Sequence, residues 1–510
     1  MKETAVVRWL ARPSTQLACA FGIPFLLRAI PQILAGPSVP VGYDTTVGYA
    51  PFASLVQRYG FGQEAVLLLE AHMAPGLWLL IGALAWTGVS SIALLEVLPP
   101  VLYGVMGLAL WRFCRRGLGW DPTHSGFALI LVLAYFMPLR YGWDALKDVL
   151  GISLFLVALA ETPHFPSRRS YTFFTIFASA SVLTEEVEAV LLGGIAGILF
   201  LNSLRHRRWS PLWLATGLSC VALVLFYAGL LGPAGPGPFP PFGLPAPIAT
   251  APPFLQSLVN YPSWIAKAWA ATLVIAVGVL PIAYFAWRGR LRSPITDAWA
   301  FAAGVGTFGV YFLPGSWTFP VWPTWLVLLS FPLCLSAARA LMRLDRRHAA
   351  VVIGILAVLS GGFLVLPADH ALPYFTSPET RWYIPTSMVQ TSIPLDRVAG
   401  VETAVAWLND HVTARDWIVV SNVFAGFVIV FGDPTHVYPY HQVETVDWRL
   451  FANASMVYTI YWSDSNETWF AGGIPPSVFQ PVFTSGGVSL FASRGSTVSS
   501  LRTQSSSELK

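Results

Sequence analysis

Charged residues are scarce in this sequence. Only 11% of its 510 residues are Asp, Glu, Lys or Arg, whereas 55% are hydrophobic and the mean hydropathy is +0.60. Soluble domains carry about 25% charged residues. Most of the chain therefore cannot be solvated on all sides, which excludes a soluble globular protein as a description of the whole.

Cysteine is also scarce. The four cysteines lie in or beside apolar segments, with no spacing typical of a disulfide framework or a zinc site; they are Cys19, Cys114, Cys220 and Cys334. The net charge is only +4, and the basic residues are scattered in small groups. This pattern gives no indication of nucleic-acid binding.

Long apolar segments recur along residues 1–366. A spanning helix needs about 20 apolar residues, and the first such segment, 15–35, is too long for the apolar region of a signal peptide. Including this segment, the sequence predicts about eleven transmembrane helices. The other ten lie at 92–111, 125–139, 144–160, 170–184, 187–204, 211–231, 264–287, 296–313, 321–340 and 349–366.

The positive charges decide how one further apolar segment, 73–88, is interpreted. If it lies at the membrane surface, the arginine clusters after the second, fourth, sixth, eighth and tenth helices all fall on one side, which the positive-inside rule makes cytoplasmic. If it spans, nearly every later cluster moves to the other side. The sequence therefore predicts a multi-pass cell-membrane protein with a cytoplasmic N-terminus and an extracytoplasmic C-terminal domain.

The C-terminal part has a different pattern. Residues 401–412 have helical spacing, and "DWIVVSN", "FVIVFG", "MVYTIYW" and "GVSLFAS" are typical of strands. We therefore predict a small α/β domain over 367–495 and a Ser-rich disordered tail over 496–510.

Ionisable residues gather at the predicted outer face. They are Asp44 in the first outer loop, Arg140, Asp144, Lys147 and Asp148 at the second, and Glu185, Glu186 and Glu188 at the third. Such residues at membrane depth usually face a cavity or a partner. Cations could hold a lipid phosphate while a carboxylate performs acid–base chemistry.

Each of these residues also has a purely structural interpretation. Asp44 could cap a helix that begins at "DTTV". The group from Asp144 to Asp148 could be a solvated helix start with an ion pair on one helix face. The glutamates could form a solvated turn. The hypothesis of a functional site depends on their shared side of the membrane.

The order of features over residues 15–205 resembles the GT-C-fold membrane glycosyltransferases, in particular prokaryotic relatives of the protein-mannosyltransferase and aminoarabinose-transferase groups. The resemblance is carried by "GYDTT" after the first helix, the pair Pro99–Pro100, "WRFCRR", "MPLR" and "WDALKDVLG". It implies a polyprenyl-phosphate-linked sugar donor as partner, together with membrane lipid and an acceptor that the sequence does not identify.

The resemblance also implies roles for individual residues. Asp44 matches the first-loop carboxylate proposed as general base or metal-positioning residue, and Arg140 and Lys147 match basic residues near the lipid phosphate. Asp144, Asp148 and Glu185 are supporting residues. Many mannosyltransferases of this fold have two adjacent acidic residues in this loop, but here two threonines follow Asp44. We therefore assign no metal ligand and no certain cofactor, and a divalent metal remains an open option.

Two functions follow. The first is an inverting glycosyltransferase acting at the outer face; the second is a non-enzymatic membrane protein, either a transporter or a scaffold that presents the outer domain. No internal repeat of broken helices, which many transporters show, is recognisable. The "WWDYG" motif of oligosaccharyltransferases is absent too, so transfer of a whole glycan to asparagine is not expected. The sequence leaves open the sugar, the acceptor, the oligomeric state and an archaeal or bacterial origin.

Overall fold

The computed structural model describes most of the chain. The described residues are 13–62 without 38, 74–206 without 166, 211–227, parts of 266–288, 293–309, 322–376 without 345, 385–432, 436–463 without four residues between 441 and 445, and 476–501.

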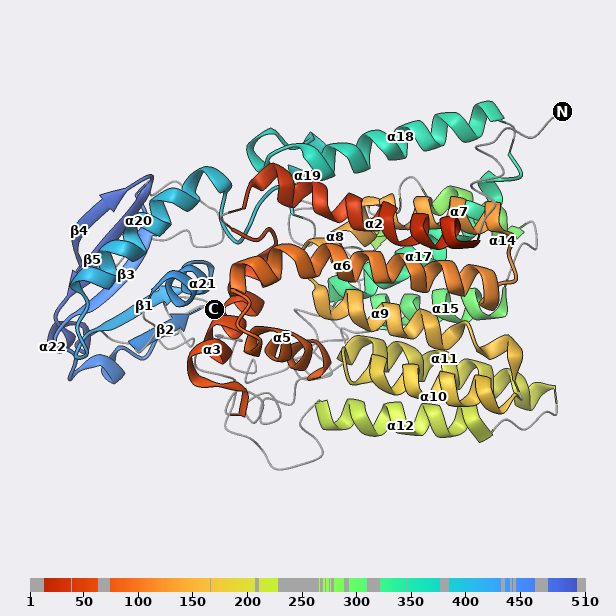
Figure 1. The fold of residues 1–510 in the computed structure, drawn as a ribbon, viewed down its shortest axis with the longest axis horizontal. Coiled ribbons are helices and arrows are strands. Elements are labelled where there is room, and N and C mark those ends of the chain that lie inside the picture. Colours follow the sequence, from red (N-terminus) through yellow and green to blue (C-terminus); the bar gives the residue numbers. More distant parts are fainter. Residues whose placement is uncertain are drawn as a thin grey trace.

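A bundle of helices forms the larger part of the molecule, and a five-stranded sheet stands at one end of it (Figure 1). Within the described residues, five helices are long and apolar enough to cross a membrane, and the bent pair α7 and α8 makes a sixth if it counts as one span. The five are α2 (Pro13–Ala35), α6 (Ser91–Arg112), α11 (Glu186–Arg205), α17 (Trp322–Leu341) and α18 (Arg346–Val365).

Shorter helices lie at the other predicted spans. They have 9 to 17 residues and are α9 (Leu146–Leu159), α10 (Arg168–Val182), α12 (Pro211–Tyr227), α14 (Leu280–Arg288) and α15 (Pro294–Gly309). The predicted span 264–287 lies only partly within the described residues. The protein is mainly α-helical and polytopic, as predicted, while the count of about eleven spans stays a prediction.

The predicted span 125–139 is broken in two. α7 (Pro122–Ala134) and α8 (Phe136–Trp143) meet at Tyr135 with a bend of 63°. A continuous α-helix would need the amide of residue 138 to donate to the carbonyl of Ala134, and Pro138 has no amide hydrogen. The break leaves α8 as a short helix that carries Arg140 and ends just before Asp144.

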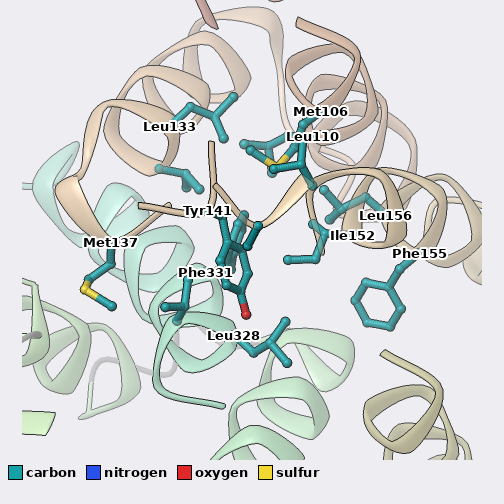
Figure 2. Packing of buried hydrophobic residues seen from close by; sticks show 14 of the residues in the cluster. Met106, Leu110, Leu133, Met137, Tyr141, Ile152, Phe155, Leu156, Leu328 and Phe331 are labelled. Atoms are coloured by element: carbon teal, nitrogen blue, oxygen red, sulfur yellow. The ribbon is translucent and has the colours of Figure 1, made fainter. Parts of the chain in front are cut away.

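Tyr141 anchors α8 in the helical core (Figure 2). Its hydroxyl donates a hydrogen bond of 2.9 Å to the carbonyl of Thr324 in α17, and its ring centroid lies 6.4 Å from that of Phe331. Buried side chains of α6 and α9 complete the packing, among them Met106, Leu110, Ile152 and Leu156. This packing fixes the position of the neighbouring Arg140.

The helix within the segment 73–88 is short. α5 (Gly76–Trp86) has 11 residues, which at 1.5 Å per residue gives about 17 Å. The hydrocarbon core of a bilayer is about 30 Å thick. The described helix cannot cross it, which favours the prediction that this segment lies at the membrane surface.

The C-terminal domain has one mixed sheet in the order β2-β1-β3-β5-β4. β1 is parallel to β2 and β3, and β5 is antiparallel to β3 and β4. The strands are β1 (Trp417–Ser421), β2 (Val437–Tyr440), β3 (Val457–Trp462), β4 (Gln480–Ser485) and β5 (Val488–Ser493). β1, β3, β5 and the helix α20 (Leu395–His411) confirm the predicted elements, whereas β2 and β4 were not predicted.

The prediction of a strand at "FVIVFG" is wrong. The segment belongs to α21 (Asn422–Phe431), a helix that begins directly after β1. Eight of its residues, Asn422 to Ile429, are buried, so the run is apolar on every side and has no periodicity. A short run of this kind cannot be assigned to helix or strand from its pattern.

Shorter segments complete the fold. They are η1 (Thr45–Tyr49), α3 (Ala50–Tyr59), η2 (Phe113–Gly117), η3 (Thr162–His164), η5 (Ala368–His370), α19 (Pro373–Thr376), η8 (Trp448–Phe451) and α22 (Gly495–Val498). α22 occupies the start of the predicted disordered tail, and its Val498 is buried. Residues 502–510 of that tail lie outside the described residues, and the domain boundary at 366 stays a prediction.

Charged side chains lie at both ends of the bundle. At the end far from the sheet, Arg116 of η2 binds Glu161 at 2.9 Å, and Arg112 binds the same carboxylate. The loop after α2, the α8–α9 turn and the α10–α11 turn lie at the end that carries the sheet (Figure 1). The predicted candidate residues thus share one end of the bundle, and the assignment of that end to the cell exterior stays a prediction.

Candidate functional site

Asp44 follows the first long helix and precedes η1. Its side chain makes no capping hydrogen bond, and no described residue forms a hydrogen bond or ion pair with it. The side chain is exposed. The interpretation of Asp44 as a helix cap therefore has no hydrogen bond to support it, and its carboxylate can accept a proton or a hydrogen bond from a ligand.

Two cations affect the pKa of the Asp44 carboxyl. Although its side chain is accessible to solvent, the protein packed around the first loop raises the pKa of its carboxyl above the ordinary value, and the charges of Arg140 and Lys147 oppose that rise. Asp44 thus lies within electrostatic reach of both predicted phosphate-binding residues.

Arg140 is held by Asp144. Its Nη1 lies 2.5 Å from Oδ1 of Asp144, and its side chain is 22% exposed while that of Asp144 is 3% exposed. The prediction that Asp144 shares a helix face with Lys147 and Asp148 is wrong, because α9 begins only at Leu146. Asp144 instead ends α8, one turn after Arg140, which explains the ion pair between these two residues.

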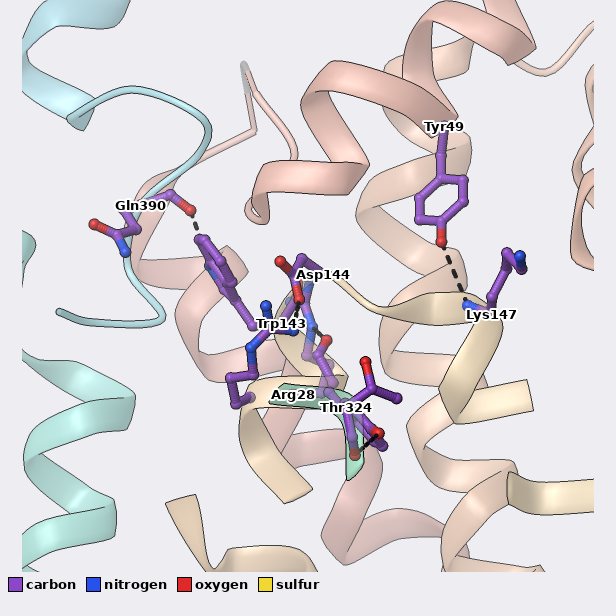
Figure 3. Close-up of polar contacts among 10 residues, drawn as sticks. Arg28, Tyr49, Trp143, Asp144, Lys147, Thr324 and Gln390 are labelled. Atoms are coloured by element: carbon purple, nitrogen blue, oxygen red, sulfur yellow. Dashed lines mark hydrogen bonds and ion pairs between the residues drawn. The ribbon is translucent and has the colours of Figure 1, made fainter. Parts of the chain in front are cut away.

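A buried arginine ties the first loop to the α8–α9 turn. Arg28 of α2 is fully buried and donates hydrogen bonds to the carbonyls of Gly142, Val41 at 3.2 Å and Trp143 at 3.4 Å. Figure 3 shows it beneath Trp143 and Asp144. The guanidinium of Arg28 therefore faces the interior of the bundle and does not extend to its surface.

Lys147 points to the start of α11. Its Nζ lies 2.7 Å from Oε2 of Glu186 and 3.2 Å from Oε2 of Glu185. Glu186 also accepts the backbone N–H of Ala74 at 2.6 Å, so it is a bound group rather than part of a solvated turn. Lys147 is 11% exposed at its side chain, and its charge is shared between these two carboxylates.

Behind Lys147 lie three buried carboxylates. Ligand oxygens of Asp148, Glu185 and Glu188 all lie within 4.8 Å of one another. Asp148 and Glu185 were predicted as supporting residues, but Glu188 was not. The spacing of three residues from Glu185 to Glu188 at a helix start was the signal that could have found it, because it puts both side chains on one helix face.

The glycine and tyrosines beside Asp44 have structural contacts. Gly42 has φ +117°, and a Cβ there would lie 2.2 Å from the carbonyl oxygen of Trp143. The close approach that requires glycine is therefore to Trp143, not to a ligand. Tyr49 is buried against Trp78, with ring centroids 4.9 Å apart, and its hydroxyl accepts the backbone N–H of Lys147.

The C-terminal domain closes over the same loop. The carbonyl of Gln390 accepts the N–H of Gly42 at 3.0 Å and the indole N–H of Trp143 at 3.1 Å (Figure 3). On α21, a Cβ at Gly426 would lie 2.1 Å from the carbonyl of Thr46, so α21 packs directly on η1. No sequence pattern indicated that the outer domain positions the loop of Asp44.

Comparison with known proteins gives a likeness in structure and none in sequence. No family model matches the chain, and no curated protein matches it in sequence. In overall structure the chain is similar to ArnT from Cupriavidus metallidurans, whose crystal structure was solved with bound undecaprenyl phosphate, with a TM-score of 0.51, 15% identity, and coverage of 93% of this chain and 98% of ArnT. This likeness confirms the predicted GT-C-type fold, including the C-terminal domain.

Proposed function

We propose that this protein is a membrane glycosyltransferase that transfers a sugar from a polyprenyl-phosphate-linked donor to an acceptor at the outer face of the membrane. The observation that carries the proposal is the exposed carboxylate of Asp44, without a described hydrogen-bonding partner, within electrostatic reach of Arg140 and Lys147. The fold shared with ArnT, solved with undecaprenyl phosphate, supports the class of lipid.

The residues suggest how the reaction would proceed. An acceptor hydroxyl oxygen forms the new bond to the anomeric carbon while the bond from that carbon to the phosphate oxygen breaks. Asp44 takes the hydroxyl proton, and the polyprenyl phosphate leaves with the bonding electron pair. Cations stabilise the negative charge that develops on the leaving oxygen.

Arg140 is better placed than Lys147 to meet that phosphate. The side chain of Arg140 is 22% exposed, whereas that of Lys147 is 11% exposed and its ammonium binds two carboxylates. We expect Arg140 to contact the phosphate and Lys147 to contribute mainly through its charge. This order refines the equal roles that the sequence implied.

A binding and turnover experiment tests the function. The full-length protein in lipid nanodiscs is incubated with undecaprenyl phosphate, and complex formation is measured by native mass spectrometry. Radiolabelled undecaprenyl-phosphate sugars are then offered with candidate acceptors, and released lipid phosphate is measured. Saturable binding plus release supports the proposal, and Asp44→Asn is expected to keep the binding and lose the release.

The matched control is Asp410→Asn, which makes the same chemical change on the exposed surface of α20. It is expected to behave like the natural protein in both assays. Absence of saturable undecaprenyl phosphate binding by the natural protein would overturn the proposal and favour the transporter or scaffold alternative.

A further inference from the structure

The three carboxylates behind Lys147 come from the starts of two neighbouring helices. Asp148 lies in the first turn of α9, Glu185 is the N-cap of α11, and Glu188 lies in its first turn. Their exposed fractions are 8%, 7% and 0%. Two helices thus bring three acidic side chains to one buried point.

Two of these carboxylates have oxygens without partners. Both Oε1 and Oε2 of Glu188, and Oδ1 of Asp148, are buried without a hydrogen bond among the described residues. Burying an ionised carboxylate without compensation is costly. The partial positive charge at a helix N-terminus offsets only part of that cost.

The nearby cations bind only one member of the cluster. Lys147 binds Glu185 of the cluster and Glu186 outside it, and Arg140 binds Asp144. Among the described residues, no basic side chain forms an ion pair with Asp148 or Glu188. Lys147 and Arg140 offset part of the negative charge of Asp148 through space, and protons or a bound cation would supply the rest of the compensation that the cluster needs.

The geometry suits a cation. Oxygens on opposite sides of a Mg²⁺ or Ca²⁺ ion lie about 4–5 Å apart, from bond lengths of about 2.0–2.6 Å, and the cluster oxygens lie within 4.8 Å of one another. All three ligands are carboxylates, which suit Mg²⁺, Mn²⁺ and Ca²⁺ rather than softer metals. Gly151 lets α9 approach these side chains closely, because a Cβ there would lie 3.0 Å from Cβ of Glu185 and 3.3 Å from Cδ of Glu188.

We propose that Asp148, Glu185 and Glu188 bind one divalent cation of the Mg²⁺, Mn²⁺ or Ca²⁺ class and that this ion holds the ends of α9 and α11 together. The ion neutralises the acidic cluster next to Lys147, and its binding site is separate from Asp44. The inference depends on these contacts and not on the proposed function.

Mn²⁺ binding tests this inference. The full-length protein in detergent is treated with a chelator, transferred to metal-free buffer and titrated with Mn²⁺, and free Mn²⁺ is measured by electron paramagnetic resonance. We expect one saturable site that Mg²⁺ or Ca²⁺ competes for, and a thermal unfolding temperature that rises with Mn²⁺. Glu188→Gln and Asp148→Asn are each expected to weaken binding at least about tenfold.

Two control variants keep the result specific. Glu402→Gln, in the C-terminal domain, and Asp44→Asn are both expected to bind Mn²⁺ as the natural protein does. The proposal is overturned if the natural protein has no saturable Mn²⁺ site. It is equally overturned if Asp44→Asn removes the site while Glu188→Gln keeps it, because the ion would then belong to the first loop.

Discussion

The indole N–H of Trp143 donates a hydrogen bond of 3.1 Å to the backbone carbonyl of Gln390, which also accepts the N–H of Gly42 at 3.0 Å. One carbonyl of the segment before α20 thus joins the first loop to the α8–α9 turn. Asp44 lies two residues after Gly42, and Asp144, which binds Arg140, lies one residue after Trp143. The carbonyl of Gln390 therefore helps to set the distance between the Asp44 carboxylate and Arg140.

Removal of that indole donor is expected to affect turnover more than folding. Trp143→Phe keeps the aromatic packing and loses one hydrogen bond, which contributes about 0.5–1.5 kcal/mol to stability. Loss of positioning is expected to lower kcat about tenfold. Trp120→Phe is the matched control, because its buried Nε1 has no described partner. Equal kcat in both variants would show that the contact does not position the site.

Asp44→Asn is expected to lower turnover at least about a hundredfold, because a general base contributes about 10²–10⁴ in rate. Thermal stability should change little, since the Asp44 side chain makes no capping bond. Turnover of a lipid-linked sugar and thermal unfolding measure the two effects. A variant with normal turnover contradicts the assignment, and the base would then be sought among Asp144, Asp148 and Glu185.

If the proposed activity holds, the pH profile of the natural protein should reflect the raised pKa of Asp44. A base works only when deprotonated, so activity is present above its pKa and is lost as the pH falls through it. We expect the acidic limb of kcat/KM to lie above the ordinary aspartate value of about 3.9. A limb at or below that value would contradict the raised pKa.

Arg140→Gln is expected to weaken binding of undecaprenyl phosphate about tenfold or more, because a charge-assisted hydrogen bond contributes about 1.5–3 kcal/mol. Lys147→Gln should also weaken it about tenfold, with the larger loss at Arg140. Arg116→Gln breaks an ion pair at the other end of the bundle and serves as the control. Unchanged affinity in both site variants would assign Arg140 and Lys147 to structural ion pairs with Asp144 and with Glu185 and Glu186.

The topology can be tested by labelling cysteines in intact cells. In a variant without the four natural cysteines, Thr403→Cys on exposed α20 should react with an impermeant thiol reagent. Ser167→Cys, exposed before α10 at the other end of the bundle, should react only after the membrane is made permeable. The reverse pattern would put the site of Asp44 on the cytoplasmic side.

Much of the fold could be predicted from local patterns. Apolar runs predicted helices at the right places, because the length and hydrophobicity that a helix needs to cross a bilayer are properties of its own residues. The broken span at Tyr135 was missed, although Pro138 was visible, because proline also occurs in kinked but continuous membrane helices. The strand predicted at "FVIVFG" failed because a run buried on all sides has no period.

The sequence by itself determined that Asp44, Arg140, Lys147 and the glutamates lie at one end of a membrane bundle, because helix lengths and the alternation of basic clusters fix which ends meet. Only the tertiary structure decided which charge binds which. Arg140 binds Asp144, Lys147 binds Glu185 and Glu186, and Glu188 lies beside Asp148. The pair of Arg140 and Asp144 is local, four residues apart, and depends on where α8 ends. The other two groupings depend on distances of a few ångströms between α9 and α11, and helix periodicity carries no information about the packing between helices that sets such distances.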